Sequence, residues 1–357
     1  MAIVSWIWFF CVLILTGYHL VIFRRRKMPR TLPFIDWPGV SIVIAHKNHS
    51  HFVKQNLESI NKQDYPSFEI ILIDDNSSEP EKNALHEIAS GVEKVKVLQS
   101  NASGKKAAIN QAVHAAQYEY ILCTDADCQP VSDQWIKKMV QSGRGGKMVL
   151  GYSPYIRKKG WLNKLLRFET VMTAMQYISW TWAGKPYMGV GRNMMYHREL
   201  FQTIDPYHKD QLLYGDDDLW VQKAAHHTWI KICDDAGAHV ISEPAADIKS
   251  WWRQKHRHLS AGHEYNKGAW LQPGVYGVAL IGNWLLILVL LFCSHWANWL
   301  PVFLIGLLIR WFNYNVWTKQ LGSRDTIAWY PVLEIQYAVY LMVGGVVTLF
   351  NKKRTWS

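Results

Sequence analysis

The sequence has few cysteines, and none of them is spaced as a redox or zinc-binding pair. Its 357 residues include five cysteines, and no C-x-x-C pair occurs among them. Two of them, Cys11 and Cys293, lie in apolar stretches. This usage excludes a disulfide framework and is typical of reduced thiols in a cytosolic environment.

The chain also lacks internal repeats, low-complexity tracts and an excess of acidic residues. Lysine and arginine number 39 against 28 aspartates and glutamates, which gives a net charge of +11. A basic chain of this size binds nucleic acid, anionic lipid or a phosphate-bearing substrate. Much of the positive charge stands beside apolar runs, and the 19 tryptophans are typical of a membrane interface. We therefore expect a membrane partner and no nucleic acid.

The N-terminus lacks the features of a cleaved signal peptide. The run from Ile3 to Phe23 is apolar and long enough to cross a bilayer, no basic residue precedes it, and no small-residue cleavage site is evident. The basic residues 24–27 come directly after the run, and the positive-inside rule places them in the cytoplasm. We expect a transmembrane helix over residues 1–23 and a proline-containing linker over residues 24–38.

A regular alternation of strand and helix patterns begins at residue 40. β-branched runs at Val40–Ala45 and Phe68–Ile73 predict buried strands, and the segments "VEKVKVLQS" and "YEYILCTDAD" predict two more. Segments with helix-forming patterns fill the three intervals between these strands. The alternation predicts an α/β fold with a doubly wound, mostly parallel sheet, whose ligands bind beyond the carboxyl ends of the strands.

Four aspartates stand at these strand ends. Asp74 and Asp75 end the second strand, and Asp125 and Asp127 end the fourth as a D-x-D. Two like charges at the end of a buried strand are costly unless a positive charge lies nearby. Hard carboxylate oxygens suit Mg²⁺ or Mn²⁺, which bridge the phosphate oxygens of a substrate. By itself the D-x-D is weak evidence, because such pairs also occur by chance on surfaces.

A second acidic cluster, "GDDDLW", precedes a helical segment. Asp216 or Asp217 can cap the N-terminus of that helix and gain from its dipole. Three consecutive carboxylates exceed what a cap requires, and their mutual repulsion could raise the pKa of one of them and make it a general base. Both interpretations, cap and base, are open from the residues alone.

Two aromatic segments flank the acidic cluster. The segment "WLNKLLRFETVMTAMQYISWTW" predicts a helix that packs in the core or contacts a membrane or an acceptor. The segment "WWRQKHRHLSAG", Trp251 to Gly262, is aromatic and basic. Its cations could hold a diphosphate and its tryptophans could stack on a sugar, or it could form an interfacial helix on anionic lipid.

The tail contains three apolar runs, at about Val275–Phe292, Ala297–Trp311 and Ile327–Phe350. The first predicts a membrane span. Arg310 in the second run and Glu334 and Gln336 in the third leave these two open between spans and a re-entrant hairpin. Three tail spans would place the basic residues 352–354 outside, against the charge rule, and two would place them inside. We expect two or three spans within residues 263–357.

Six short motifs in a fixed order give the chain a resemblance to a known family. They are "IDDNSS", "GKKAAIN", "DAD", "GVGRNMMY", "GDDDLW" and "QKHRH". Together they resemble a membrane-bound family 2 glycosyltransferase, of the group with cellulose synthases, hyaluronan synthases and lipid glucosyltransferases, over about Ser41 to Gly262. The resemblance implies a GT-A type nucleotide-sugar-binding domain, here residues 39–262, and inversion at the anomeric carbon.

The resemblance also implies roles for the aspartates at the strand ends. Asp75, with Asp74 beside it, is expected to contact the nucleotide base, and Lys105 of "GKKAAIN" is expected to lie near the donor. In the D-x-D, Asp127 is expected to bind the metal and Asp125 the donor and the metal.

Two motifs depart from the family pattern. Gly215 stands where E-D-x-D-L has its glutamate, and alignment on the final Asp-Leu makes Asp216 the general base, with Asp217 as its rival. "QKHRH" resembles Q-x-x-R-W and implies donor binding by Gln254 and Arg257. His258 replaces the tryptophan of that motif, which accompanies long-chain polymer synthesis, so processivity is in doubt.

The resemblance implies inverting transfer of a sugar from a UDP- or GDP-sugar to a lipid or lipid-linked acceptor, with Mg²⁺ or Mn²⁺ as cofactor. The implied location is the cytoplasmic face of the inner membrane, with several spans and a cytosolic catalytic domain. A partner subunit is left open. The alternatives are a processive polysaccharide synthase subunit and a non-catalytic membrane scaffold that retains the fold.

Overall fold

The chain folds into two compact units, seen in a computed structural model that describes residues 2–26, 36–204, 216–261, 267–292 and 296–350. The sheet unit comprises Met28–Ile156 and Gly184–Glu243. The helical unit comprises Met1–Lys27, Arg157–Ala183 and Pro244–Ser357. Two segments inside the region 39–262 therefore belong to the helical unit.

A seven-stranded sheet forms the centre of the sheet unit, in the order β3-β2-β1-β4-β7-β6-β8. Its strands are β1 (Val40–His46), β2 (Phe68–Asp74), β3 (Val95–Gln99), β4 (Tyr120–Asp125), β6 (Met148–Leu150), β7 (Met194–His197) and β8 (Ile230–Ile232). Strands β1 to β4 pair in parallel, and β7 is antiparallel to both of its neighbours. A separate antiparallel pair joins β5 (Cys128–Pro130) to β9 (Val240–Ser242). The predicted α/β fold with a mostly parallel sheet is confirmed.

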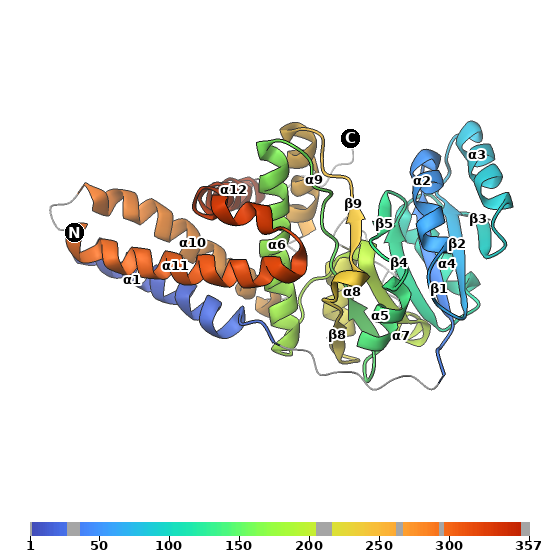
Figure 1. Ribbon diagram of the computed structural model, residues 1–357, viewed down its shortest axis with the longest axis horizontal. Coiled ribbons are helices and arrows are strands. Elements are labelled where there is room, and N and C mark those ends of the chain that lie inside the picture. Colours follow the sequence, from blue (N-terminus) through green and yellow to red (C-terminus); the bar gives the residue numbers. More distant parts are fainter. Residues whose placement is uncertain (1, 27–35, 205–215, 262–266, 293–295, 351–357) are drawn as a thin grey trace. The chain divides into compact units, whose positions relative to one another are not determined.

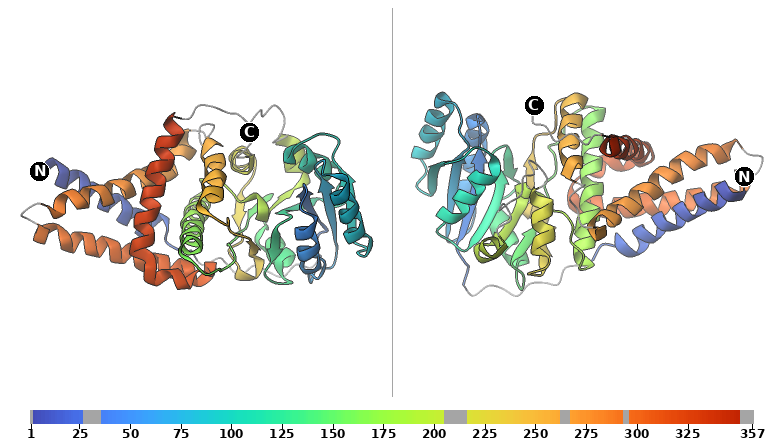
Figure 2. Two further views of the ribbon diagram at one scale, coloured as in Figure 1. Left: turned by 90° about the horizontal axis from the view of Figure 1, so that it is seen from above. Right: turned by 180° about the vertical axis from the view of Figure 1, so that it is seen from behind.

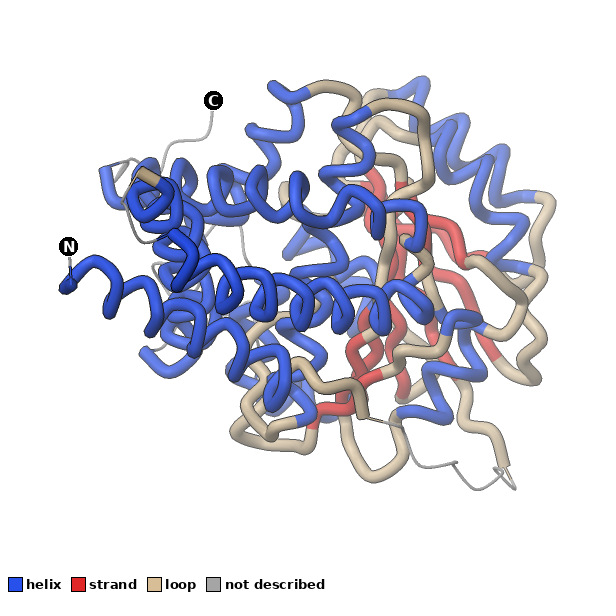
Figure 3. Tube along the Cα trace, turned by 60° about the vertical axis from the view of Figure 1, so that its left-hand side comes forward, coloured by secondary structure: helices blue, strands red, loops and turns tan. Residues whose placement is uncertain are grey.

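Helices alternate with the strands along the sheet unit, and Figure 3 shows the strands gathered in one place. In the sheet unit these helices are α2 (Ser50–Asn61), α3 (Glu79–Ser90), α4 (Lys105–Ala115), α5 (Trp135–Ser142), α7 (Arg198–Ile204) and α8 (Asp216–Ala224). Alternate residues of β1, Val40, Ile42 and Ile44, are buried in one core cluster with Val53 and Leu57 of α2. Each such side chain contributes about 1.5–3 kcal/mol when it is fully buried. The strand pattern read from the sequence thus forms the hydrophobic core.

The parallel strands bring their carboxyl ends to one edge of the sheet. His46 at the end of β1 is in register with Asp74 of β2, and Ala45 is in register with Asp125 of β4. The chain builds β2 and β3 on one side of β1 and returns to place β4 on the other side. This reversal is the point at which open α/β sheets bind their ligands.

The helical unit contains long apolar helices. Its elements are α1 (Ala2–Gly17) with a π turn η1 (Tyr18–Ile22), α6 (Trp161–Trp182), α9 (Ile248–Ala261), α10 (Lys267–Leu291), α11 (Trp296–Leu321), η5 (Arg324–Trp329) and α12 (Tyr330–Phe350). Helices α1, α10 and α11 run side by side (Figures 1 and 2). Four segments are long and apolar enough to cross a membrane: Ala2–Ile22, Leu271–Leu291, Asn298–Leu321 and Arg324–Val347.

The charged residues inside the apolar runs are paired. Arg310 Nε donates to Glu334 Oε1 at 2.8 Å, and Trp284 Nε1 donates to Glu334 Oε2 at 3.2 Å. Gln336 Oε1 accepts a hydrogen bond of 2.8 Å from Trp161 Nε1. Partners of this kind allow ionisable and amide side chains to lie within an apolar environment.

Candidate functional site

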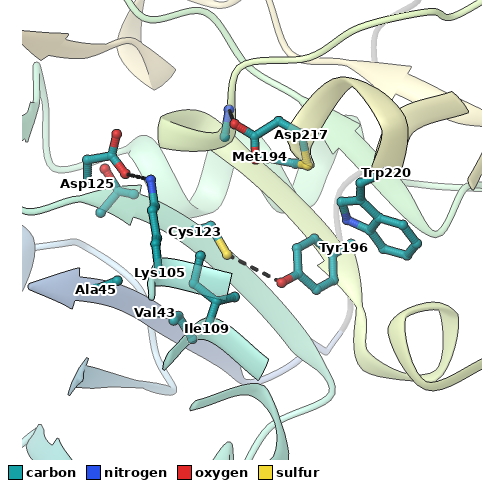
Figure 4. A pocket seen from close by; sticks show the side chains of 12 residues that line it. Val43, Ala45, Lys105, Ile109, Cys123, Asp125, Met194, Tyr196, Asp217 and Trp220 are labelled. Carbon is teal, nitrogen blue, oxygen red and sulfur yellow. Dashed lines mark hydrogen bonds and ion pairs between the residues drawn. The ribbon is translucent and has the colours of Figure 1, made fainter. Parts of the chain in front are cut away.

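A small pocket lies at the carboxyl edge of the sheet (Figure 4). Lys105, the first residue of α4, reaches across to Asp125 at the end of β4, and Lys105 Nζ lies 2.5 Å from Asp125 Oδ1. Asp217 and Trp220 of α8 line the same pocket with Tyr196 of β7. The structure therefore gathers one lysine and two aspartates that are far apart in the sequence.

Asp75 and Asp74 lie at the neighbouring strand end. Asp75 Oδ1 accepts a hydrogen bond of 2.6 Å from the backbone N–H of Gly104, which joins the end of β2 to the start of α4. Asp74 Oδ2 accepts from the N–H of Ser77 at 3.1 Å, and His46 Nδ1 lies 3.2 Å from Asp74 Oδ1. Burial alone would raise the pKa of Asp74, but these hydrogen bonds lower it below its usual value. Asp74 is therefore a charged anchor for the loop, and base contact by either residue stays a prediction.

The D-x-D aspartates can be tested for their fit to a cation. Asp125, Asp127 and Cys128 each offer a ligand atom, and these atoms lie within 4.8 Å of one another. Burial raises the pKa of Asp127, and the charge of Asp125 adds to the rise. Burial likewise raises the pKa of Cys128, whose thiol donates to Asp127 Oδ1 at 3.4 Å. Two converging carboxylates that repel each other suit Mg²⁺ or Mn²⁺, whereas a protonated thiol does not.

The carboxylates of the acidic cluster at the start of α8 accept hydrogen bonds from different backbone N–H groups. Asp218 is buried and accepts from the N–H of Gly189 at 3.3 Å. Asp217 accepts from the N–H of Gly191 at 3.1 Å and faces the pocket. Asp216 is the first residue of the helix, and its side chain lies outside the described residues. The choice between Asp216 and Asp217 as general base stays a prediction.

Sequence reasoning missed two residues of "GVGRNMMY". A Cβ atom at Gly191 would lie 2.2 Å from Asp217 Oδ2, so only glycine allows this close approach. Arg192 donates through Nε to Ser153 Oγ at 2.7 Å, and its charge opposes the rise in the pKa of Asp127. The motif itself was the available signal, although the sequence does not reveal which aspartate the glycine meets.

The remaining predicted donor ligands belong to the helical unit. Gln254 lies on α9 and is partly buried. Arg257 lies on the same helix, but its side chain is outside the described residues. Donor binding by both residues stays a prediction.

Comparison with known proteins relates part of the chain to a family. Residues 41–205 match the model of glycosyl transferase family 2. The chain is 36% identical over 114 residues to a beta-monoglucosyldiacylglycerol synthase of Trichormus variabilis, a match that covers 30% of this chain and 23% of that relative. It is 37% identical over 90 residues to a poly-beta-1,6-N-acetyl-D-glucosamine synthase of Staphylococcus epidermidis, covering 25% and 22%. The matched part thus spans less than a quarter of either relative.

A solved structure extends the similarity at the level of fold. A mannosyltransferase from Pyrobaculum calidifontis, determined in complex with GDP-Man and Mn²⁺, superposes with a TM-score of 0.60 over 97% of this chain and 100% of its own. The two sequences are 17% identical, so the likeness concerns the GT-A fold alone. The family match, the mostly parallel sheet and the acidic motifs agree with one another: over residues 41–205 the chain is similar to glycosyl transferase family 2.

Proposed function

We propose that this enzyme transfers a sugar, with inversion, from a nucleotide-sugar to a lipid or lipid-linked acceptor. The observation that carries the proposal is the convergence of Lys105, Asp125 and Asp217 on one pocket at the switch point of the sheet. Asp127, next to Asp125, adds the second carboxylate of a cation site. A nucleoside diphosphate requires positive charge at such a site, and the lysine and a bound cation would both supply it.

The proposed reaction is a single displacement. Asp216, with Asp217 as the alternative, takes the proton of the acceptor hydroxyl. The acceptor oxygen then forms a bond to the anomeric carbon as the bond from that carbon to the diphosphate oxygen breaks, which inverts the configuration. Bound Mg²⁺ or Mn²⁺, held by Asp125 and Asp127, would supply charge stabilisation for the diphosphate.

The proposed binding roles follow the positions of the side chains. Lys105 lies beside Asp125 and offers a positive charge to the donor phosphates. Gln254 and Arg257 are proposed to bind the donor, and Arg257 to stabilise the departing diphosphate. Asp75 and Asp74 are proposed to lie at the nucleotide base.

The proposed acceptor and location rest on the membrane helices and on the relatives. Four apolar helices could cross a membrane, and a relative is named for the glucosylation of diacylglycerol. The basic residues Arg24–Arg26 follow the first of these helices, which favours the cytoplasmic side of the inner membrane for that end. A processive synthase is the second candidate, because another relative is a poly-N-acetylglucosamine synthase.

The test is a screen of the full-length protein with UDP- and GDP-sugars, Mg²⁺ or Mn²⁺ and native membrane lipid extract, with mass spectrometry of the products. We expect one donor to yield a glycosylated lipid. Asp127→Ala is expected to lose most of this activity because it removes a proposed cation ligand. Asp216→Asn is expected to lose most of it because a positioned general base contributes about 10²–10⁴-fold. Full activity in both variants would end the proposal, and a nucleotide-sugar that binds without turnover would favour a scaffold.

A further inference from the structure

We propose that α12 lies in the plane of the membrane, with one aliphatic face in the acyl region, and does not cross the bilayer. Among the described helices, the crossing ones are then α1, α10 and α11. Length and composition qualify α12 as a span equally well, so the distinction rests on its neighbours and its direction. The inference is independent of the reaction proposed above.

One end of the three-helix bundle can be identified by its contacts. Arg26, which follows η1, donates through Nη1 to the carbonyl of Trp182 at the end of α6, at 2.7 Å. The ring of Trp182 stacks on that of Trp317 near the end of α11, with centroids 5.6 Å apart. The end of α6 therefore lies where α1 ends and α11 ends, which we call the arginine end. Tyr18, near the end of α1, donates to the carbonyl of Gln272 near the start of α10 at 3.0 Å, so α10 begins at this end. Helix α9 is held to α6 by the ion pair of Lys255 and Glu169.

Helix α12 remains in contact with α6 and α9 along half of its length. Trp329, just before α12, packs on Trp161 of α6 with ring centroids 5.2 Å apart. Tyr340 packs on Trp251 of α9 at 5.2 Å. The helix rises about 16 Å between these two positions. A crossing helix would by then have carried Tyr340 about halfway through a hydrocarbon core of about 30 Å, away from α9.

The direction of α12 agrees with these contacts. In Figure 1, α12 is seen almost end-on, whereas α1, α10 and α11 are seen along their length. In the left view of Figure 2, α12 is seen at full length and runs across α10 and α11. Helices α6, α9 and α12 thus form a layer, held by the contacts above, that lies across the bundle direction.

The face of α12 that this layer leaves uncovered is aliphatic. The large side chains exposed on it are Val332, Ile335, Val339, Val343 and Val346, each 39–49% exposed. They recur at helical spacing and form one stripe. The opposite face, with Leu333, Glu334 and Tyr337, is buried. A stripe of this kind beside three membrane spans fits lipid acyl chains, because in-plane helices bury an apolar face at the acyl boundary.

The charges of the tail agree with this topology. Residues Lys352–Arg354 follow α12 in the sequence, and an in-plane α12 leaves them on the same side of the membrane as Arg24–Arg26. A crossing α12 would place the two basic clusters on opposite sides. The positive-inside rule favours the first arrangement.

The test measures depth in the membrane. A genetically encoded spin-label amino acid replaces Val332, Val339 or Val346, one position at a time, in the full-length protein in lipid vesicles. Because this label is not attached to cysteine, the native cysteines are kept. These positions share one face and span about 21 Å of helix. We expect equal immersion depths within a few ångströms, by accessibility to oxygen and to a polar relaxant. A depth gradient of about 20 Å along the three positions would overturn the proposal.

A matched control comes from α10. Val278 and Leu285 of α10 and Phe292, which directly follows it, have the same spacing and are exposed, and we expect α10 to cross the bilayer. Their depths should differ strongly. As a second measurement, epitope tags after Ser357 and between Cys293 and His295 should be accessible from opposite sides of sealed vesicles, and accessibility from the same side would also overturn the proposal.

Discussion

At Gly191 the backbone approaches the carboxylate of Asp217 so closely that no side chain fits between them. The N–H of Gly191 donates to Asp217 Oδ2 at 3.1 Å, and an added Cβ would lie 2.2 Å from the same oxygen. A methyl group at this position must displace Asp217 from the pocket that it shares with Lys105 and Asp125. The effect of a substitution should therefore appear in catalysis.

We predict that Gly191→Ala lowers kcat by about 10²-fold or more, the size expected when a catalytic constellation is misplaced by about 1 Å. The control is Gly91→Ala, where an added Cβ meets nothing within 4 Å. Initial rates with saturating donor and acceptor, together with thermal unfolding, check the prediction. A folded Gly191→Ala variant with wild-type kcat would contradict it.

The pKa of Asp127, a proposed cation ligand, bears on how cation binding should depend on pH. Burial and the charge of Asp125 raise its pKa, so the folded state holds this proton more tightly than the unfolded state. The ionised carboxylate consequently costs stability above the raised pKa, and the cost disappears as the pH falls through it. A bound cation offsets the same cost, and protons therefore compete with it.

We predict that Mn²⁺ raises the melting temperature of the protein at about pH 7 and that the rise shrinks progressively toward about pH 4, as protons compete for Asp127. Asp127→Asn should abolish the rise, and Glu87→Gln on the exposed side of α3 should leave it intact. Melting curves at several Mn²⁺ concentrations provide the measurement. A pH-independent rise, or one retained in Asp127→Asn, would place the cation elsewhere.

Among the helices, α9 is fixed to α6 by a largely buried ion pair. Lys255 Nζ lies 2.5 Å from Glu169 Oε1, and both side chains are mostly shielded from solvent. Lys255 stands next to Gln254, so the pair fixes the segment that carries the predicted donor ligands. Breaking a buried pair leaves one charge without compensation.

We predict that Lys255→Met destabilises the helical unit by about 3–5 kcal/mol and that Glu169→Gln in the same chain restores part of the loss. Lys62→Met is the matched control, because Lys62 pairs with Glu58 on an exposed surface and should matter little. Thermal or denaturant unfolding in detergent measures the differences. Equal effects at the two sites would show that the pair has no such role.

Elements differed in how far the sequence could predict them. Strands β1 and β2 contain apolar runs rich in β-branched residues. The positions of β1 to β4 were predicted together with the carboxylates at the ends of β2 and β4. Strands such as β6 and β8 have three residues each, too few for a periodic pattern, and form through pairing with distant neighbours. The direction of α12 could not be predicted either, because hydropathy is the same for a crossing and an in-plane helix.

The features of the candidate site also differ in how far the sequence could predict them. The D-x-D was predictable because strand-end carboxylates have a local sequence signature. The approach of Gly191 to Asp217 was not, because it depends on β7 returning antiparallel to β4 and on α8 packing beside it. Such contacts between residues distant in the sequence form only in the tertiary structure.

For the molecule as a whole, the packing of the helical unit bears on the size of the product. Large side chains fill its interior in the part that the structure describes: Trp8, Tyr276, Tyr314 and Trp317 are all fully buried. His258 stands where the family motif for polymer synthesis has tryptophan. A long glycan leaving through this bundle would have to displace that packing, at about 3–5 kcal/mol for each large buried side chain.

We therefore predict products that carry one or a few sugars. With radiolabelled donor and excess lipid acceptor, early time points should show a single short product whose amount, but not length, grows with time. A chase with unlabelled acceptor should leave that length unchanged. Long glycan chains formed while most of the acceptor is still unmodified would contradict the prediction and favour the processive synthase. Labelled donor that binds without forming any product would contradict the proposed sugar transfer.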